Sequence, residues 1–134
     1  MFKAYLIHLY ARYSRIKASM TDSCIFCKIV SNEARAAIVY RDDQATAFRD
    51  IHPVAPIHIL IVPNRHIDSV NALEIEDEPL IGHLFKVAGQ LAKSEGIDRG
   101  GYRLITNTGA DGGQTVFHIH LHLIGGQRMR HPMG

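Results

Sequence analysis

The sequence predicts an α+β fold, with an antiparallel sheet of about five strands, one long helix and a short helix near the N-terminus. Three features of the chain support this fold. Several short apolar segments are separated by turn residues, which is typical of strands. One long segment has apolar residues at helical spacing. Near the C-terminus, histidine alternates with apolar residues, which favours a strand with two unlike faces.

The strands before the histidine segment are short and end at turn or proline residues. We expect them at residues 37–40, 45–49, 57–62 and 102–108. The first two flank Asp42-Asp43 and predict a hairpin. The third is almost wholly apolar, and Pro63 follows it, which indicates a buried central strand.

Two segments favour helices. The short helix is expected over residues 25–30, where Ser31-Asn32 ends it. The long helix begins at Glu76–Pro79, since acidic residues and proline suit a first turn, and Gly96 is placed to end it. Its apolar stripe requires burial, so we expect helices on one face of the sheet.

Length and charge limit the classes of protein. With 134 residues and a net charge of +2, the chain suits one domain and lacks the strongly basic character of a broad nucleic-acid surface. No apolar run approaches the roughly 18 residues of a membrane span. Cys24 and Cys27 lie too close in sequence for a disulfide framework and favour metal binding, redox work or burial in a reducing compartment. We therefore expect a cytoplasmic protein that binds neither nucleic acid nor membrane.

Residues 1–19 differ from the rest because basic, aromatic and aliphatic residues occur there without any acidic residue. Met20 then opens a more ordinary sequence, so we expect a domain over 20–134 preceded by a non-functional extension. The alternative is a transit peptide, which would make the protein organellar.

The histidine segment, residues 116–124, is where we expect the chemistry. In a strand, His118, His120 and His122 would share one face, and the intervening residues would face the core. These core residues are Phe117, Ile119, Leu121 and Leu123. Imidazole acts as nucleophile, acid, base or metal ligand near neutral pH, so the row indicates a reactive site. A metal site, an exposed polar face and satisfied histidines under a loop are the alternatives.

The turn at Gly112–Thr115 directly precedes these histidines. Glycine lets backbone N–H groups approach an anion closely, so this turn is a candidate phosphate cradle. The sequence contains neither the glycine patterns of P-loop and dinucleotide-binding proteins nor the serine elbow of hydrolases.

The segment His118-Ile119-His120-Leu121-His122-Leu123-Ile124 resembles the signature of the histidine triad superfamily. The resemblance extends from about Cys24 to the C-terminus and is greatest to the Hint branch, whose members are purine nucleoside phosphoramidases. Further matching positions are 48–51, Pro53, Ala55-Pro56, His58, Asn107 and 112–115. The resemblance implies a homodimeric hydrolase of purine nucleoside 5′-phosphoramidates, an adenosine 5′-monophosphoramidase, with the 102–108 strand and the long helix as interface.

The resemblance also implies roles for single residues. His120 would be the nucleophile that forms a nucleotidyl-histidine, and His122 and His118 would supply hydrogen bonds or protons to the phosphate oxygens. Asp50 would accept both ribose hydroxyls. His58 would support the triad from behind. Gln114 would contact the phosphate and take part in catalysis. The remaining binding residues would be Asn107, Gly113 and Thr115 at the phosphate, and Phe26, Ile29, Phe48 and Ile51 around the base.

Cys24, Cys27, His66 and His118 resemble the zinc ligands of relatives that carry this cysteine pair. Such a site would be structural, because catalysis in the Hint branch requires no cofactor, and many members lack the pair. The chain departs from eukaryotic members because it contains no tryptophan near its C-terminus, which leaves the preferred leaving group open.

Two other functions stay open at this stage. Cleavage of dinucleoside polyphosphates is the activity of a neighbouring branch, and Leu123–Gly126 lacks the glutamine usual there. The other is a nucleotide-sensing or partner-binding module whose turnover is incidental.

Overall fold

The protein is described by a computed structural model that covers residues 23–133. Five strands form one antiparallel sheet in the order β1-β2-β3-β5-β4, which confirms the predicted α+β class. The strands are β1 (Ile38–Arg41), β2 (Ala45–Arg49), β3 (Ile57–Pro63), β4 (Tyr102–Ile105) and β5 (Leu121–Gly125). The extension over residues 1–19, with its transit-peptide alternative, lies outside the described residues.

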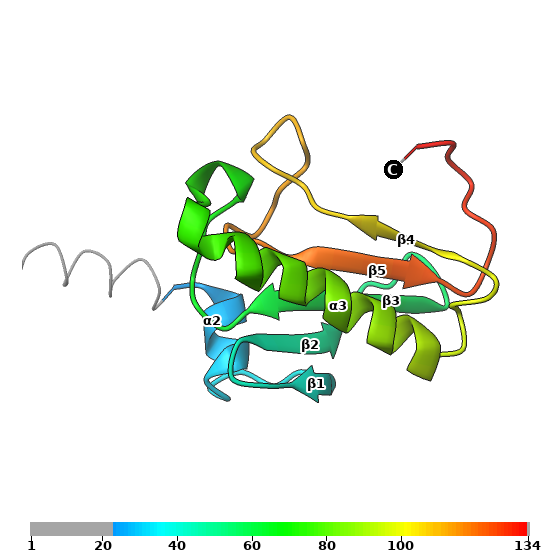
Figure 1. Cartoon of the computed structure of the whole chain (residues 1–134), viewed down its shortest axis with the longest axis horizontal. Coiled ribbons are helices and arrows are strands. Elements are labelled where there is room, and N and C mark those ends of the chain that lie inside the picture. The colour runs from blue at the N-terminus through cyan, green and yellow to red at the C-terminus, as the bar shows by residue number, and fades with distance from the viewer. Residues whose placement is uncertain (1–22, 134) are drawn as a thin grey trace, which may run out of the picture.

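Helix α3 (Glu78–Ser94) crosses one face of the sheet (Figure 1). A 3-10 turn at Ile75–Asp77 precedes it, so the predicted start at Glu76 falls in this turn. Gly96 follows the helix with a φ of 72°, a left-handed conformation that glycine adopts without strain. The apolar stripe of α3 is buried against alternate residues of β2, β3 and β5.

Helix α2 (Ile25–Val30) lies on the opposite face, so the expectation of helices on one face is wrong. The reason is that β3 is buried on both sides. Its residues Ile59 and Ile61 pack with α3, whereas Leu60 and Val62 pack with α2. The uninterrupted apolar run of β3 is what a central strand covered on both faces requires.

Strand β5 begins at Leu121 and not at residue 116, so the predicted histidine strand is too long. Phe117 is 55% exposed and does not face the core as predicted, whereas Ile119, Leu121 and Leu123 are buried. Since Ile61 pairs with Leu121, the same register would bring Ile119 opposite Pro63, a residue without an amide hydrogen. The Ile119 amide donates instead to the carbonyl of residue 67 at 2.7 Å.

Strand β4 ends at Ile105, three residues before the predicted Thr108, and it is an edge of the sheet. A loop of residues 106–120 then leads to β5. Beyond β5, the chain passes β4 and ends on its far side (Figure 1).

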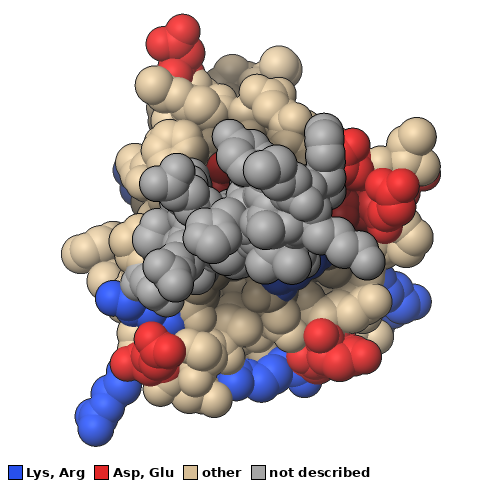
Figure 2. All heavy atoms as spheres, turned by 90° about the vertical axis from the view of Figure 1, so that its left-hand side faces the viewer, with Lys and Arg blue, Asp and Glu red and all other residues tan. Residues whose placement is uncertain are grey.

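The surface at the α2 end carries lysine, arginine, aspartate and glutamate side chains in separate groups around its rim (Figure 2). No field of one sign dominates the described part of this face, in keeping with the small net charge. Among residues 23–133, no helix combines the length and the apolar character needed to cross a membrane.

Candidate active site

His120 is buried, and its imidazole has a defined proton arrangement. Its Nδ1 lies 2.7 Å from the backbone carbonyl oxygen of His118. Because a carbonyl can only accept, Nδ1 carries the hydrogen, and Nε2 keeps a free lone pair. Burial lowers the pKa of His120 below its usual value, against the opposing effect of the His118 carbonyl. The ring is therefore neutral at pH 7 and nucleophilic at Nε2.

His122 receives the opposite arrangement through His58. The Val54 amide donates to Nδ1 of His58 at 3.2 Å, so the hydrogen of His58 is on Nε2. That Nε2 lies 2.9 Å from Nδ1 of His122 and donates to it. The hydrogen of His122 is thus on Nε2. Burial, followed by the neighbouring His120 and His58, lowers the pKa of His122 to about 4.

The two imidazoles stand side by side. Their ring centroids are 4.9 Å apart, and the ring of Phe26 makes a T-shaped contact with His120, with centroids 5.0 Å apart. One ring offers a lone pair and its neighbour an N–H group. This pair can attack an electrophile and donate a hydrogen to it or to its leaving group.

The ring of His118 lies apart from this pair. It is fully buried, its Nε2 donates to the carbonyl of Pro63 at 2.8 Å, and its Nδ1 lies 3.4 Å from Cys24 Sγ and 3.5 Å from Cys27 Sγ. All three imidazoles nevertheless lie on the α2 side of the sheet, because Phe26 packs on both His118 and His120, and His120 packs on His122.

Three side chains converge next to that of His118 and complete a cluster of four. The ligand atoms of Cys24, Cys27, His66 and His118 all lie within 4.8 Å of one another. His66 Nε2 contacts the carboxylate of Asp68 at 2.6 Å, which turns Nδ1 of His66 toward Cys27 Sγ, 3.2 Å away. Burial, followed by Cys24, raises the pKa of the Cys27 thiol to about 12.

This donor set suits zinc. Two sulfurs and two imidazole nitrogens match tetrahedral Zn²⁺, and both histidines have a partner at their other nitrogen that fixes the ring. The buried thiol would gain from a cation, because Zn²⁺ stabilises a thiolate that burial disfavours.

Asp50 lies beside His58 at the end of β2. Its Oδ1 accepts from the His52 amide at 2.8 Å, and its Oδ2 lies 3.3 Å from Nε2 of His58. The carboxylate is half-buried and keeps acceptor sites for a diol.

The predicted apolar wall is only partly brought together. Phe26, Ile29 and Phe48 are buried in one cluster, whereas Ile51 is 84% exposed on the neighbouring loop. Leu60 joins the cluster and was missed by the sequence analysis. It could have been found from register, since Phe48 and Leu60 are cross-strand partners on one face.

Gln114 is buried, and its amide group is fully engaged with the backbone. Its Nε2 donates to the carbonyls of Asp68 at 2.7 Å and Val116 at 3.1 Å, and its Oε1 accepts from the Gly109 amide at 3.0 Å. This side chain therefore positions the 109–116 loop. The importance of Asp68 could not be seen in the sequence, because Gln114, which donates to its carbonyl, lies 46 positions away.

The predicted phosphate residues occupy that loop and the end of β4. Gly113, with a φ of 80°, and Thr115 are exposed, and Asn107 is half-buried. At Gly112, a Cβ atom would stand 2.4 Å from the Thr108 carbonyl oxygen, so only glycine fits.

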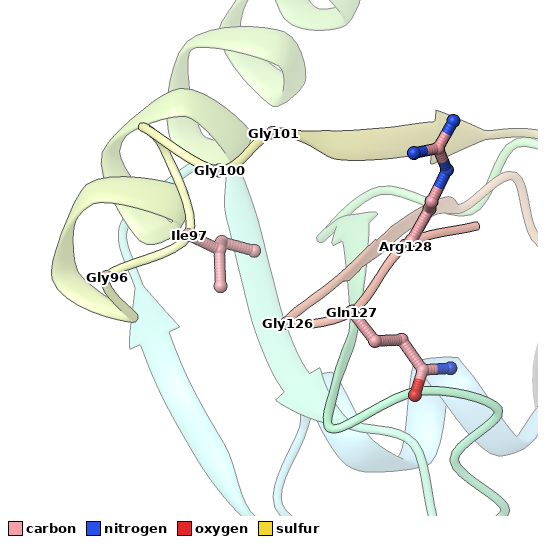
Figure 3. A pocket seen from close by; sticks show the side chains of 7 residues that line it. All are labelled: Gly96, Ile97, Gly100, Gly101, Gly126, Gln127 and Arg128. Atoms are coloured by element: carbon pink, nitrogen blue, oxygen red, sulfur yellow. The ribbon is translucent and has the colours of Figure 1, made fainter.

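A cavity of about 650 Å³ at the end of α3 holds none of the predicted site residues. Glycine backbone surrounds it, the Ile97 side chain points into it, and that of Gln127 points away (Figure 3). A second cavity, of about 630 Å³, lies next to the histidines between β4, β5 and the C-terminal segment. We call it the tail cavity; its lining residues are 53–56, Arg103, Ile105, Ile124, Gln127 and 129–131.

Comparison with known proteins gives a consistent result. The family model of the HIT domain matches residues 31–129. The purine nucleoside phosphoramidase of Escherichia coli K12 is 52% identical over 115 residues, which cover 86% of this chain and 93% of the relative. An uncharacterized HIT-like protein of Synechocystis is 44% identical over 115 residues, covering 86% of this chain and all of the relative.

Solved structures agree with this match. A HIT family hydrolase from Legionella pneumophila superposes with a TM-score of 0.81 at 46% identity, covering 84% of this chain and 100% of the other. A histidine triad protein from Clostridium difficile gives 0.79 at 42% identity, covering 81% and 94%.

Proposed function

This chain belongs to the HIT domain family and is a hydrolase of that type, and from this premise we propose that it cleaves purine nucleoside 5′-phosphoramidates. The observation that carries the proposal is the free Nε2 lone pair of His120 beside the N–H group of His122. The name of the Escherichia coli relative supports the substrate class.

In the first step, Nε2 of His120 attacks the phosphorus and the P–N bond breaks. The departing nitrogen keeps the electron pair of that bond, takes a proton from solvent and leaves as an amine, while the Nε2–H group of His122 donates a hydrogen bond to it. The His118 carbonyl holds Nδ1 of His120 and stabilises the positive charge that develops on the ring. The product is a nucleotidyl-histidine.

In the second step, water replaces His120. Its oxygen bonds to phosphorus, one of its hydrogens leaves to solvent as a proton, and the electron pair of the P–Nε2 bond returns to His120. A nucleoside monophosphate leaves, and both histidines regain their starting protonation.

Substrate binding uses the groups around this pair. We assign the ribose diol to Asp50 and the purine to the cluster of Phe26, Ile29 and Phe48, with Ile51 closing over it from the loop. The phosphate oxygens go to Asn107, Thr115 and the amide of Gly113, on the loop that Gln114 holds in place. His58 is a positioning residue, since it acts through His122.

We further propose structural zinc at Cys24, Cys27, His66 and His118. Zinc would bind without contacting the substrate and would steady the His118 carbonyl. The reaction itself requires no metal.

A homodimer through β4 and α3 is also part of the proposal. Strand β4 is an edge strand, so its outer N–H and C=O groups can pair with a second copy. Phe85 on α3 is 51% exposed, which gives this helix apolar surface to bury. We place the domain at residues 20–134 and its site of action in the cytoplasm.

The test is turnover of an adenosine 5′-phosphoramidate by the full chain, beside a diadenosine polyphosphate. We expect cleavage of the phosphoramidate. The turnover rate should fall by roughly 1,000-fold or more in His120→Ala, as is typical when a nucleophile is removed, and should change little in the exposed control His52→Ala. Faster cleavage of the polyphosphate would favour the neighbouring branch. Tight nucleotide binding without turnover would favour a sensing module.

A further inference from the structure

Residues 66–68, which we call the connecting segment, join the cluster of two cysteines and two histidines to the 109–116 loop. On one side, the ring of His66 belongs to the cluster. On the other side, the carbonyl of Asp68 accepts from Nε2 of Gln114 at 2.7 Å. The carboxylate of Asp68 contacts Nε2 of His66 at 2.6 Å. Asp68 therefore bonds to a candidate metal ligand through its side chain and to the loop through its backbone.

A second hydrogen bond fixes the connecting segment to the chain that follows the loop. The Ile119 amide donates to the carbonyl of Ile67 at 2.7 Å. Ile119 lies in the sequence between His118, a candidate metal ligand, and His120, the proposed nucleophile. The connecting segment is thus bonded to the chain on both sides of the residues that would approach the phosphate.

Gln114 passes the position of Asp68 on to the rest of the loop. Its backbone amide donates to the Gly109 carbonyl at 3.0 Å, and its Oε1 accepts from the Gly109 amide at 3.0 Å. These bonds close the loop around the Gln114 side chain. The two loop residues assigned to the phosphate, Gly113 and Thr115, are the sequence neighbours of Gln114. A displacement of the Asp68 carbonyl would therefore displace the phosphate site.

A cavity of about 500 Å³ lies between the cluster and the loop. His66 and Asp68 line it from the connecting segment, Cys24 from the start of α2, and Thr115 from the loop. None of these four residues lines the tail cavity. Because the described side chains leave this space open, the position of the loop here depends on its hydrogen bonds to the connecting segment.

The connecting segment would be held more firmly when the cluster is occupied. His66 Nδ1 lies 3.2 Å from Cys27 Sγ, and a thiol is a weak hydrogen-bonding group. A coordinate bond from Nδ1 to Zn²⁺ would fix the ring, and the Nε2–H group would then hold the Asp68 carboxylate in place. A loop that is already ordered costs less conformational entropy when a ligand binds to it.

We propose that the connecting segment couples zinc in the cysteine–histidine cluster to the affinity of the site for a nucleoside 5′-monophosphate, with Asp68 as the positioning residue. This inference rests on the proposed function and the proposed zinc site, and it adds a regulation of the same site. Asp68 acts through Gln114 and takes no part in the covalent steps. Because coupling between two sites is reciprocal, bound nucleotide must raise the affinity for zinc by the same factor.

The experiment measures binding of AMP to the full chain by titration calorimetry under reducing conditions, with zinc-loaded and with metal-free protein. We expect the zinc-loaded protein to bind AMP about 5- to 10-fold more tightly, at the low end of couplings between two sites. Adenosine should bind equally to both forms, because it has no phosphate to contact the 109–116 loop.

The reciprocal measurement follows the metal instead of the nucleotide. Competition with a chelator gives the affinity for zinc with and without saturating AMP, and the ratio should equal the factor found by calorimetry. A residue that only stabilised the fold would not produce equal factors in the two titrations.

Three variants test the role of Asp68. Asp68→Ala should bring both factors toward 1. Asp68→Asn keeps an oxygen that can accept from Nε2 of His66, so most of the coupling should remain. Asp111→Ala is the matched control, because it removes an exposed aspartate from the same loop and should leave both factors unchanged.

A further comparison applies if the metal-free chain unfolds. With zinc-loaded proteins alone, Asp68→Ala should bind AMP several-fold more weakly than Asp68→Asn. The two variants carry the same charge, so a difference between them reflects the lost hydrogen bond to His66. Equal affinities of these two variants would overturn the positioning role.

The other outcomes are also distinct. Equal affinity of the zinc-loaded and metal-free forms for AMP, or a factor that survives Asp68→Ala, would overturn the coupling. An equal effect of zinc on AMP and adenosine would place the coupling in α2, whose residues join the base cluster, and would overturn the route through the loop. A chain that retains no zinc would overturn the coupling together with the zinc site. A chain that shows the coupling but cleaves no phosphoramidate would refute the proposed function alone.

Discussion

The carbonyl oxygen of His118 holds Nδ1 of His120 at 2.7 Å, while the ring of His118 contacts two cysteine sulfurs on its other side. His118 therefore connects the cluster of two cysteines and two histidines to the nucleophile, through its side chain on one side and its backbone carbonyl on the other. Any change that displaces His118 also displaces the group that determines which nitrogen of His120 is free.

The first prediction concerns the metal. In the double variant Cys24→Ser, Cys27→Ser, bound zinc should fall from about one per chain to almost none, because two of four ligands lose their affinity. The measurement is metal content by mass spectrometry after purification without chelators. Unchanged zinc in this variant would refute the site. The thermal midpoint should fall as well, since bound metal stabilises the folded state.

The second prediction concerns His58. His58→Ala should lower kcat by about 10- to 100-fold with a small effect on KM, because His122 loses the partner that fixes its hydrogen. Removing the hydrogen-bond partner that orients a functional histidine has effects of this size in other proteins. His58→Gln places an amide N–H near the lost Nε2–H and should restore part of kcat. A change confined to KM in His58→Ala, or no difference between the two variants, would argue against the positioning role.

The third prediction is a pH dependence of stability. His122 has a pKa of about 4 in the folded protein against an ordinary value of 6.5, so between these pH values the unfolded chain binds the proton and the folded protein does not. The free energy of unfolding should therefore decrease as pH falls from 6.5 to 4, by up to about 1.4 kcal/mol per pH unit from this residue. Urea titrations across this range measure the slope. His122→Gln should show a slope that is smaller by about one proton; an equal slope would contradict the assignment.

The fourth prediction separates binding from stability in the base pocket. Ile51 is 84% exposed, so Ile51→Ala should leave the free energy of unfolding within about 0.5 kcal/mol while weakening nucleotide binding several-fold. Ile75→Ala is the matched control, because Ile75 is 79% exposed and lies before α3, away from the pocket. Titration calorimetry with AMP measures nucleotide binding by both variants, and denaturant titration measures their free energies of unfolding. Equal affinities in the two variants would remove Ile51 from the pocket.

The fifth prediction concerns the packing of β5. A Cβ atom at Gly125 would stand 2.6 Å from Ile97 Cδ1 and 3.2 Å from Tyr102 Cβ, so Gly125→Ala should destabilise the protein by about 1–3 kcal/mol. At Gly89, inside α3, nothing lies within 4 Å, and Gly89→Ala should stabilise it by about 0.5–1 kcal/mol through helix propensity. Unfolding by denaturant compares the two, and a stable Gly125→Ala protein would contradict the contact.

Much of the fold could be predicted because the signals are local. Alternation, helical spacing and turn residues located β2, β3 and α3 almost to the residue, and Gly96 was expected at the end of the helix. The identities of the reactive side chains are also local, since His120 and His122 occur in a recognisable repeat. The side of the sheet on which α2 packs could not be predicted from local signals, because the apolar run of β3 accepts a helix on either face.

The order of residues is enough to show which residues alternate, which segments bury an apolar face and which imidazoles are available. What each imidazole does depends on contacts that form only in the folded protein. The ring of His118 contacts Cys24 and Cys27, which lie more than 90 positions away along the chain, and His122 receives its hydrogen arrangement from a residue 64 positions away. Such assignments depend on hydrogen bonds between distant segments, and periodicity along the chain carries no information about them.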